Sequence, residues 1–355
     1  MMEEIKDPLY AQVKNDIQNK ILNGEIRVGD KLMSENEMIE YYHVGRVTIR
    51  SALSTLVSDG YIKKEHGRGS FCIAVPKKTK RLNIDVLVNL DDTYLLPFIV
   101  NGITSVLDRK DCNLLLHNAK NSPEETDRFL REASERGTNG IIFQHPLIEG
   151  NQPFSSPILK RLQNVGIPSV CICGRSLDSS VNLSINDRYG SYIAAMHLLE
   201  NGHRNILGLF PVENYGVNER LEGVLNAIQM THKAQFHLLK VEGIQNSEKQ
   251  FLNALEKHDC TAVICYNDFY AVQIMHVLQT RGIRVPEEIS IIGYDDSSLA
   301  GSALPPLTTV AHPKEQMGID AANTLLNLQQ SFESNAQNDT AYRPTLIVRE
   351  TVRAI

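Results

Sequence analysis

The sequence lacks long hydrophobic runs, an apolar leader and the cysteine spacings typical of metal or redox sites. No stretch of about eighteen apolar residues occurs among its 355 residues, so we expect no membrane-spanning helix and no membrane partner. Residues 1–8 contain no apolar segment and do not resemble a secretory signal. The six cysteines form no Cys-x-x-Cys pair, which argues against a zinc or dithiol site. We expect reduced, buried thiols in a cytoplasmic protein.

Signature motifs of several enzyme classes are also missing. The sequence contains no Gly-x-Ser-x-Gly, no His-Glu-x-x-His and no Walker loop. No cluster of metal-ligating side chains stands out either. We therefore predict no catalytic residue, no bound metal and no cofactor. An enzyme stays as the alternative that a measured turnover would favour.

Positive charge is scarce overall but concentrated in one segment. The whole chain carries a formal net charge of −6, whereas residues 43–80 hold eight Lys and Arg against two acids. An acidic protein with one basic module is typical of a protein that places this module on nucleic acid phosphates. A solvated basic loop in an ordinary enzyme is the alternative interpretation.

The pattern of residues 43–70 predicts a helix-turn-helix with a wing. Apolar residues at helical spacing indicate one buried face of a helix: Val47, Ile49, Ala52, Leu53 and Leu56. Asp59-Gly60 ends this helix, and two short strands follow with Gly67-Arg68-Gly69 at their turn. Arg46, Thr48 and Arg50 stand at the start of the helix, where a recognition helix meets base edges. The predicted partner is double-stranded DNA.

The flanking segments complete this first domain. Tyr10, Val13, Ile17 and Ile21 fall on one face of a preceding helix that Asn23-Gly24 ends. Ser34 and Glu37 have the spacing of a capping box at the start of a second helix. Residues 76–80 are charged, begin with proline and show no periodicity, which is typical of a linker. We predict a DNA-binding domain at 1–75, a linker at 76–81 and a second domain at 82–355.

From residue 82 onward, short apolar strands alternate with helices. The predicted strands lie at residues 84–88, 113–116, 140–143, 169–172, 206–210, 236–241, 262–265 and 289–292. Continuous apolar strands separated by helices indicate parallel sheets that are covered on both faces. About 270 residues are too many for one small sheet, so we predict an α/β fold with two doubly wound lobes and a cleft between them.

The first domain resembles the GntR family of winged-helix regulators. The resemblance lies in three motifs: Gly-Asp-Lys-Leu-Met-Ser-Glu-Asn-Glu at 29–37, Gly-Arg-Val-Thr-Ile-Arg at 45–50 and His-Gly-Arg-Gly-Ser at 66–70. Met33 and Gly45 depart from the usual proline and serine of that family. The resemblance implies that Arg46 and Arg50 contact the operator.

The other DNA-binding candidates have alternative roles. Glu35 either accepts a hydrogen bond from a cytosine amine or orients an arginine. Lys31 is a phosphate contact or a solvated charge. His66 and Arg68, on the wing, are predicted to enter the adjacent minor groove. The full predicted set is Lys31, Glu35, Arg46, Thr48, Arg50, His66 and Arg68.

The second domain resembles the effector domain of LacI/GalR regulators, whose fold is that of periplasmic sugar-binding proteins. The motifs occur in order at residues 186–190, 197–206, 218–223, 265–268, 285–296, 306–310 and 346–351. The pairing of this body with a GntR-type head is similar to the arabinose repressors of Gram-positive bacteria. It implies a sugar effector, most simply L-arabinose, and a homodimer.

The resemblance assigns effector contacts to polar residues that follow strands or open helices. These are Asp187, Arg220, Asn267 and Asp295, with Tyr94, His145 and Arg175 as weaker additions. Asp268 is either an effector contact or only a helix cap, and capping is also the alternative for Asp187. His145, beside Pro146, is equally compatible with a surface loop.

These observations predict a cytoplasmic, sugar-responsive transcriptional repressor that binds a pseudo-palindromic operator as a dimer. A regulator of the same fold that uses another sugar or a nucleoside, as inducer or corepressor, is the alternative. A sugar receptor with the same body fold is a further alternative that fits the sequence less well, because such a receptor would carry a signal peptide and would lack a winged helix.

Overall fold

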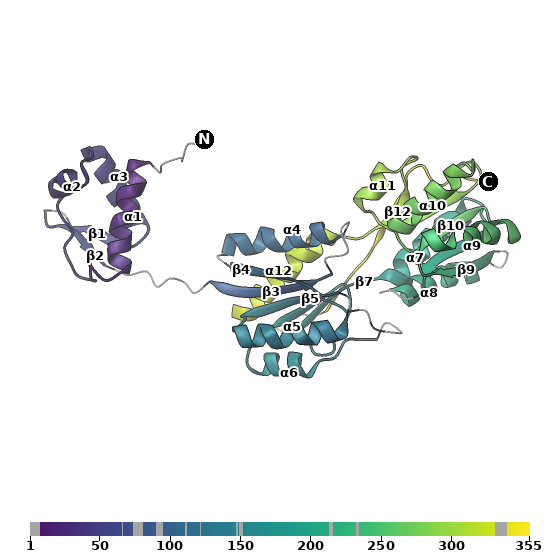
Figure 1. Ribbon diagram of the computed structural model, residues 1–355, viewed down its shortest axis with the longest axis horizontal. Coiled ribbons are helices and arrows are strands. Elements are labelled where there is room, and N and C mark those ends of the chain that lie inside the picture. The colour runs from purple at the N-terminus through teal and green to yellow at the C-terminus, as the bar shows by residue number, and fades with distance from the viewer. Residues whose placement is uncertain are drawn as a thin grey trace. The chain divides into compact units, whose positions relative to one another are not determined.

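A computed structural model describes most of the chain, which divides into two compact units, Met1–Arg81 and Leu82–Ile355 (Figure 1). The residues it describes are 8–65, 67–73, 81–89, 95–110, 112–120, 122–146, 148, 152–212, 216–231, 234–330 and 339–355. His66, Tyr94 and most of the proposed linker lie outside them. Each unit is described by itself.

The first unit is a winged helix-turn-helix. Its elements are α1 (Leu9–Leu22), α2 (Glu35–Tyr42), α3 (Arg46–Ser58), β1 (Ile62–Glu65) and β2 (Gly69–Cys72). The two strands pair antiparallel, with Ile62 opposite Cys72 and Glu65 opposite Gly69. One apolar core joins all five elements, and its buried members include Ile17, Met38, Ile49 and Leu53.

Local signals in the sequence set the ends of these helices as predicted. Ser34 Oγ accepts a hydrogen bond from the Glu37 amide at 3.3 Å, and the Glu37 carboxylate accepts one from the Ser34 amide at 2.6 Å. This reciprocal pair satisfies two amides that have no partner inside the helix. Gly24 and Gly60 follow α1 and α3 with positive φ values of 78° and 76°, which glycine adopts without strain.

Two residues assigned to apolar faces are in fact exposed. Tyr10 is 43% exposed, and Val47 is 83% exposed. A helix turns about 100° per residue, so Val47 is rotated by about 200° from the buried Ile49 and points away from the core. The prediction that Val47 belongs to the buried face of α3 is wrong.

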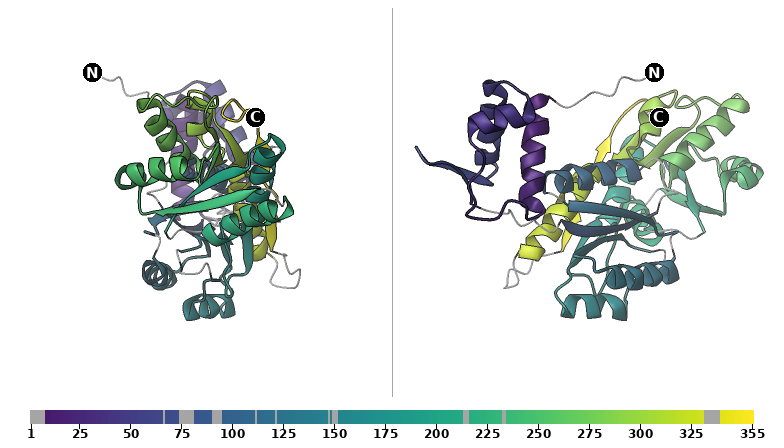
Figure 2. Two further views of the ribbon diagram at one scale, coloured as in Figure 1. Left: turned by 90° about the vertical axis from the view of Figure 1, so that its right-hand side faces the viewer. Right: turned by 60° about the vertical axis from the view of Figure 1, so that its left-hand side comes forward.

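The first lobe of the second unit is a six-stranded parallel sheet in the order β13-β7-β6-β5-β3-β4. Its strands are β3 (Leu82–Val88), β4 (Cys112–Asn118), β5 (Gly140–Gln144), β6 (Ser169–Ile172), β7 (Val181–Ile185) and β13 (Thr340–Tyr342). Its helices are α4 (Leu96–Leu107), with the short 3-10 helix η1 (Asp108–Lys110) after it, α5 (Pro123–Arg136), α6 (Pro157–Asn164) and α12 (Lys314–Gln330). α4 and α12 cover one face, and α5 and α6 the other (Figures 1 and 2).

The second lobe has the same construction. Its sheet has the order β14-β12-β11-β10-β8-β9, parallel except for β14. Its strands are β8 (Asn205–Pro211), β9 (Gln235–Val241), β10 (Ala262–Cys265), β11 (Ser290–Asp295), β12 (Thr308–Ala311) and β14 (Thr345–Ile347). Its helices are α7 (Asp187–Glu200), α8 (Val217–Met230), α9 (Ile244–Lys257), α10 (Asp268–Thr280) and α11 (Ser298–Ser302). One apolar cluster contains residues of α7 and α8, and a second cluster contains residues of α9 and α10.

The chain passes between the two sheets three times, after β7, after β12 and after β13. This confirms the predicted α/β body with two doubly wound lobes. After the second passage, α12 packs on α4 so closely that a Cβ at Gly318 would lie 2.2 Å from Ile99 O. Among the residues described above, no helix is both long enough and apolar enough to span a membrane.

Asp268, at the start of α10, joins three segments of the second lobe. Its Oδ2 accepts hydrogen bonds from the Ser297 amide at 2.7 Å and from Ser297 Oγ at 2.9 Å. Its Oδ1 accepts one from Thr309 Oγ1 on β12. Burial raises the pKa of Asp268 to about 7, and the charge of Asp295 adds to this, although the three donors oppose it.

We predict that Asp268 makes the stability of this unit fall as the pH rises from about 4 to about 7. Its folded pKa lies above the ordinary aspartate value, so the folded state holds the proton more tightly than the unfolded state. The stabilisation is therefore complete at low pH and is lost through this window, by roughly 2–4 kcal/mol. Urea unfolding across the window should show Asp268→Asn losing this component.

Glu256→Gln, on the exposed surface of α9, is the matched control and should keep the pH dependence of the wild type. Equal slopes of unfolding free energy against pH for the wild type and Asp268→Asn would contradict the prediction.

Candidate functional site

The buried guanidinium of Arg220 lies at the centre of the candidate effector site. Arg220, on α8, is 5% exposed. Its Nε donates to Asp187 Oδ1 at 2.8 Å, its Nη1 to the Tyr266 carbonyl at 2.7 Å and its Nη2 to Asp295 Oδ1 at 3.3 Å. Three of the four residues assigned to the effector by resemblance, Asp187, Arg220 and Asp295, are thus in direct contact.

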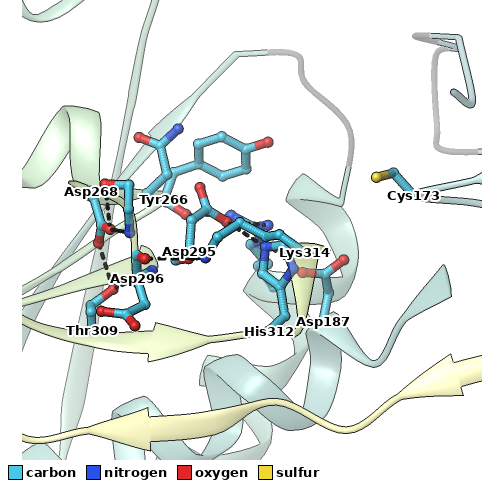
Figure 3. A network of polar contacts seen from close by, with 12 residues as sticks. Cys173, Asp187, Tyr266, Asp268, Asp295, Asp296, Thr309, His312 and Lys314 are labelled. Carbon is cyan, nitrogen blue, oxygen red and sulfur yellow. Dashed lines mark hydrogen bonds and ion pairs between the residues drawn. The ribbon is translucent and has the colours of Figure 1, made fainter. Parts of the chain in front are cut away.

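The arrangement of strands explains why these side chains meet. Tyr266 follows β10, Asp295 ends β11 and His312 follows β12, three neighbouring parallel strands. Their carboxyl ends lie at one edge of the sheet, the usual ligand-binding edge of doubly wound folds. Figure 3 shows Asp187, Tyr266, Asp295 and His312 gathered there.

Two asparagines, rather than the aspartates that follow them, cap the helices. The Asn186 side chain accepts a hydrogen bond from the Tyr189 amide, and the Asn267 side chain accepts one from the Tyr270 amide, each at 3.0 Å. The capping alternative for Asp187 and Asp268 therefore fails by one residue. Asn186 caps α7, and the Asp187 carboxylate contacts Arg220 instead.

The positive charge of the buried Arg220 guanidinium is offset by the two carboxylates that it contacts. Burial opposes the charge of Arg220, but the carboxylates of Asp187 and Asp295 outweigh it and raise the pKa of the guanidinium. Its Cζ also lies 4.7 Å from the ring centre of Tyr266 and 3.7 Å from that of Tyr294. The charge of Arg220 is fixed, and its orientation is held from several sides.

Lys314 and His312 were missed by the sequence analysis. Lys314 Nζ donates to the carbonyls of Asp295 and Asp296, the latter at 3.1 Å, and burial lowers its pKa. His312 Nε2 lies 3.4 Å from Asp295 Oδ1, and its buried Nδ1 has no partner among the described residues. Asp295 and Asp296 both have positive φ, 102° and 45°, a strained backbone that the lysine helps to hold.

No local pattern marks these two residues. A basic side chain that binds backbone carbonyls is visible only in three dimensions. The one feature of the sequence that could have indicated them is their position, because residues 312–314 directly follow a strand of the second lobe.

Three further predicted effector residues, His145, Arg175 and Asp268, have contacts of their own. His145 follows β5 in the first lobe, is buried, and its Nε2 lies 3.1 Å from Gln152 O. Arg175 is largely exposed, with Asp339 4.0 Å away. Asp268 contacts Ser297 and Thr309, as described above.

On the winged helix, the two arginines of α3 are held by the start of α2. Arg50 Nε donates to Glu35 Oε2 at 2.9 Å, and Arg46 Nη2 donates to Asn36 Oδ1 at 2.8 Å. The hydrogen bond from Arg50 is the main cause of a lowered pKa at Glu35. Both arginines are exposed, and Thr48 is half-buried. Glu35 therefore makes the contact that one of its two predicted roles, orienting an arginine, requires.

The wing carries the other basic candidates. Arg68 Nη1 lies 2.6 Å from Glu65 Oε2, and its guanidinium lies 5.6 Å from the ring centre of Phe71. Lys31 pairs with Phe71 through a backbone bridge, so its side chain starts beside the wing. Within the part of the chain that the structure describes, no group of three His, Cys, Asp or Glu side chains is placed to hold a metal ion.

Comparison with known proteins agrees with both units. Residues 9–72 match the model of the gntR family of bacterial regulatory proteins, and residues 195–352 match the periplasmic binding protein-like domain. The arabinose metabolism transcriptional repressor of Geobacillus stearothermophilus is 30% identical over 100% of both chains. The repressor of the same name from Halalkalibacterium halodurans is 30% identical over 96% of both.

A solved structure resembles the body of the chain. The crystal structure of a LacI family transcriptional regulator from Enterococcus faecium with bound ribose has a TM-score of 0.66 and 26% identity. The match covers 77% of this chain and 99% of that one. The relatives named here are transcriptional regulators, not enzymes. With full-length identity at this level, the chain belongs to the family of transcriptional repressors that join a GntR-type winged helix to a periplasmic-binding-protein-like body.

Proposed function

We propose that a monosaccharide, L-arabinose, binds at the Arg220 group and releases this repressor from its operator. The observation that carries the proposal is the buried contact of Arg220 with Asp187 and Asp295 at the carboxyl ends of the strands. The names of the two full-length relatives suggest which sugar it is.

The chemistry of the group suits a neutral polyhydroxyl ligand. Each carboxylate oxygen can accept more than one hydrogen bond, so Asp187 and Asp295 can bind sugar hydroxyls while they contact Arg220. Their two negative charges already balance Arg220 and Lys314. An anionic ligand would upset this balance in a buried site. Asn267, Tyr94, His145 and Arg175 complete the proposed contacts.

Another sugar or a nucleoside, acting as inducer or corepressor, is the second candidate. The bound ribose in the 26% identical regulator favours a pentose within this range.

The proposed DNA contacts follow the exposed basic surface of the first unit. Arg46 and Arg50 have the forked geometry that fits a guanine edge, and Thr48 adds a polar contact. Lys31, His66 and Arg68 contact the backbone or the minor groove, and Glu35 positions Arg50. A cytoplasmic homodimer would place two such heads on a pseudo-palindromic operator. The domain limits 1–75, 76–81 and 82–355 belong to the same proposal, and the division of contacts after Arg81 supports them.

We predict that Arg46→Ala and Arg50→Ala each weaken operator binding by about 1–3 kcal/mol, because each removes one bidentate donor. Fluorescence anisotropy with an operator duplex measures this loss. Lys257→Ala, on α9 of the body, is the control and should bind as the wild type does. Wild-type affinity in both arginine variants would rule out the assignment.

We predict that L-arabinose raises the melting temperature of the full chain and weakens its operator affinity by about 5- to 150-fold. Asp187→Asn should remove this response and retain operator binding, since it leaves Arg220 short of one charged partner at the site. Asp259→Asn, on an exposed turn of the same lobe, should respond normally. Calorimetry gives the sugar affinity, and anisotropy gives the operator affinity.

Two outcomes separate the parts of this proposal. If another sugar binds while millimolar arabinose does not, the effector is misidentified and the site stands. If no sugar binds, or if Asp187→Asn responds as the wild type does, the proposed site is wrong.

A further inference from the structure

The outward face of α3 carries one large, strongly exposed apolar side chain in its first turn. Relative to Ile49 in the core, Val47, Arg50, Ser51 and Ser54 project within about 100° to 200° around the helix. All four are exposed. Val47 is 83% exposed, and it lies one residue after Arg46 in the first turn.

This location distinguishes Val47 from an ordinary exposed valine. Single exposed apolar residues are common on protein surfaces and need no explanation by themselves. Val47, however, lies between the two arginines in sequence. It belongs to the N-terminal turn of α3, and the N-terminal residues of a recognition helix are the ones that meet base edges. Its neighbours on the outward face are an arginine and two serines, so its two methyl groups are the apolar part of this polar surface.

The major groove offers a matching apolar group. Of the four bases, thymine alone presents a methyl group there, and apolar side chains read it by contact. Burying an exposed isopropyl group against this methyl removes both from water, and neither has a hydrogen bond to lose.

We propose that Val47 is a specificity-determining residue that recognises the C5-methyl group of a thymine in the operator. This rests on the proposed placement of α3 in the major groove. Asn36 and Glu35 hold Arg46 and Arg50 on either side of it along the helix. The thymine therefore lies beside the guanines that these arginines contact.

The test uses uracil, which differs from thymine only by the methyl group. The full-length wild-type chain first selects its operator from randomised duplexes, and each thymine of that operator is then replaced singly by deoxyuridine. At one position the replacement should weaken wild-type binding about fourfold, as expected for the burial of one methyl group. In Val47→Ala the same replacement should have a clearly smaller effect, because alanine lacks the two γ methyl groups of valine.

Val57→Ala is the matched control, because Val57 is a half-exposed valine near the far end of the same helix. It should keep the fourfold effect. Two results would overturn the proposal without refuting the proposed DNA binding. One is a wild type that binds every uracil-substituted operator as tightly as the thymine operator. The other is a Val47→Ala variant that shows the full uracil effect at each sensitive position. Failure of the wild type to select any sequence would instead refute the proposed DNA binding, and with it the role of Val47.

Discussion

Arg220 is the residue on which the geometry of the second lobe's strand ends depends. A guanidinium that is 5% exposed needs a full set of acceptors, and here they come from the start of α7, from the end of β11 and from the backbone after β10. Removing one partner of such a buried pair typically costs about 3–5 kcal/mol. The same contacts that satisfy the charge therefore fix the positions of Asp187 and Asp295, which are proposed to bind the sugar.

The contacts of Asp295 continue into the other lobe. Its carbonyl accepts a hydrogen bond from Lys314, the first residue of α12. α12 then packs on α4 through Gly102 and Gly318, where neither position leaves space for a side chain. Because Lys314 is the first residue of α12, this helix leads from the Arg220 group into the first lobe without an intervening loop. If the proposed sugar moves Asp295, the change is passed to α12, which lies on one of the three passages between the sheets.

Local signals predicted the parts of the structure that local physics determines. The strands at Ser169–Ile172 and Ala262–Cys265 have the predicted bounds because each is a continuous apolar run. The capping box of Ser34 and Glu37 also formed as expected. By contrast, β13 and β14 are three residues long and exist through pairing with strands far away in sequence. No local pattern could reveal them.

The errors in the sequence analysis have the same origin. Val47 is apolar and lies close in sequence to buried residues of α3. Spacing alone did not show that it points away from the core, because the position of the core was unknown. Capping was the alternative for Asp187 and Asp268 because a helix start is uncertain by a residue or two, and the asparagine before each takes that role. Lys314 and His312 escaped notice because their partners are a backbone carbonyl and a carboxylate on another strand.

We propose that sugar and operator compete through one conformational equilibrium of a single chain. Linkage then requires equality of two factors, the weakening of operator binding by saturating L-arabinose and the weakening of arabinose binding by saturating operator. Titration calorimetry of arabinose into the full chain, with and without operator duplex, measures the second factor. Competition requires both factors to be equal and well above one. An arabinose affinity that operator leaves unchanged would contradict it.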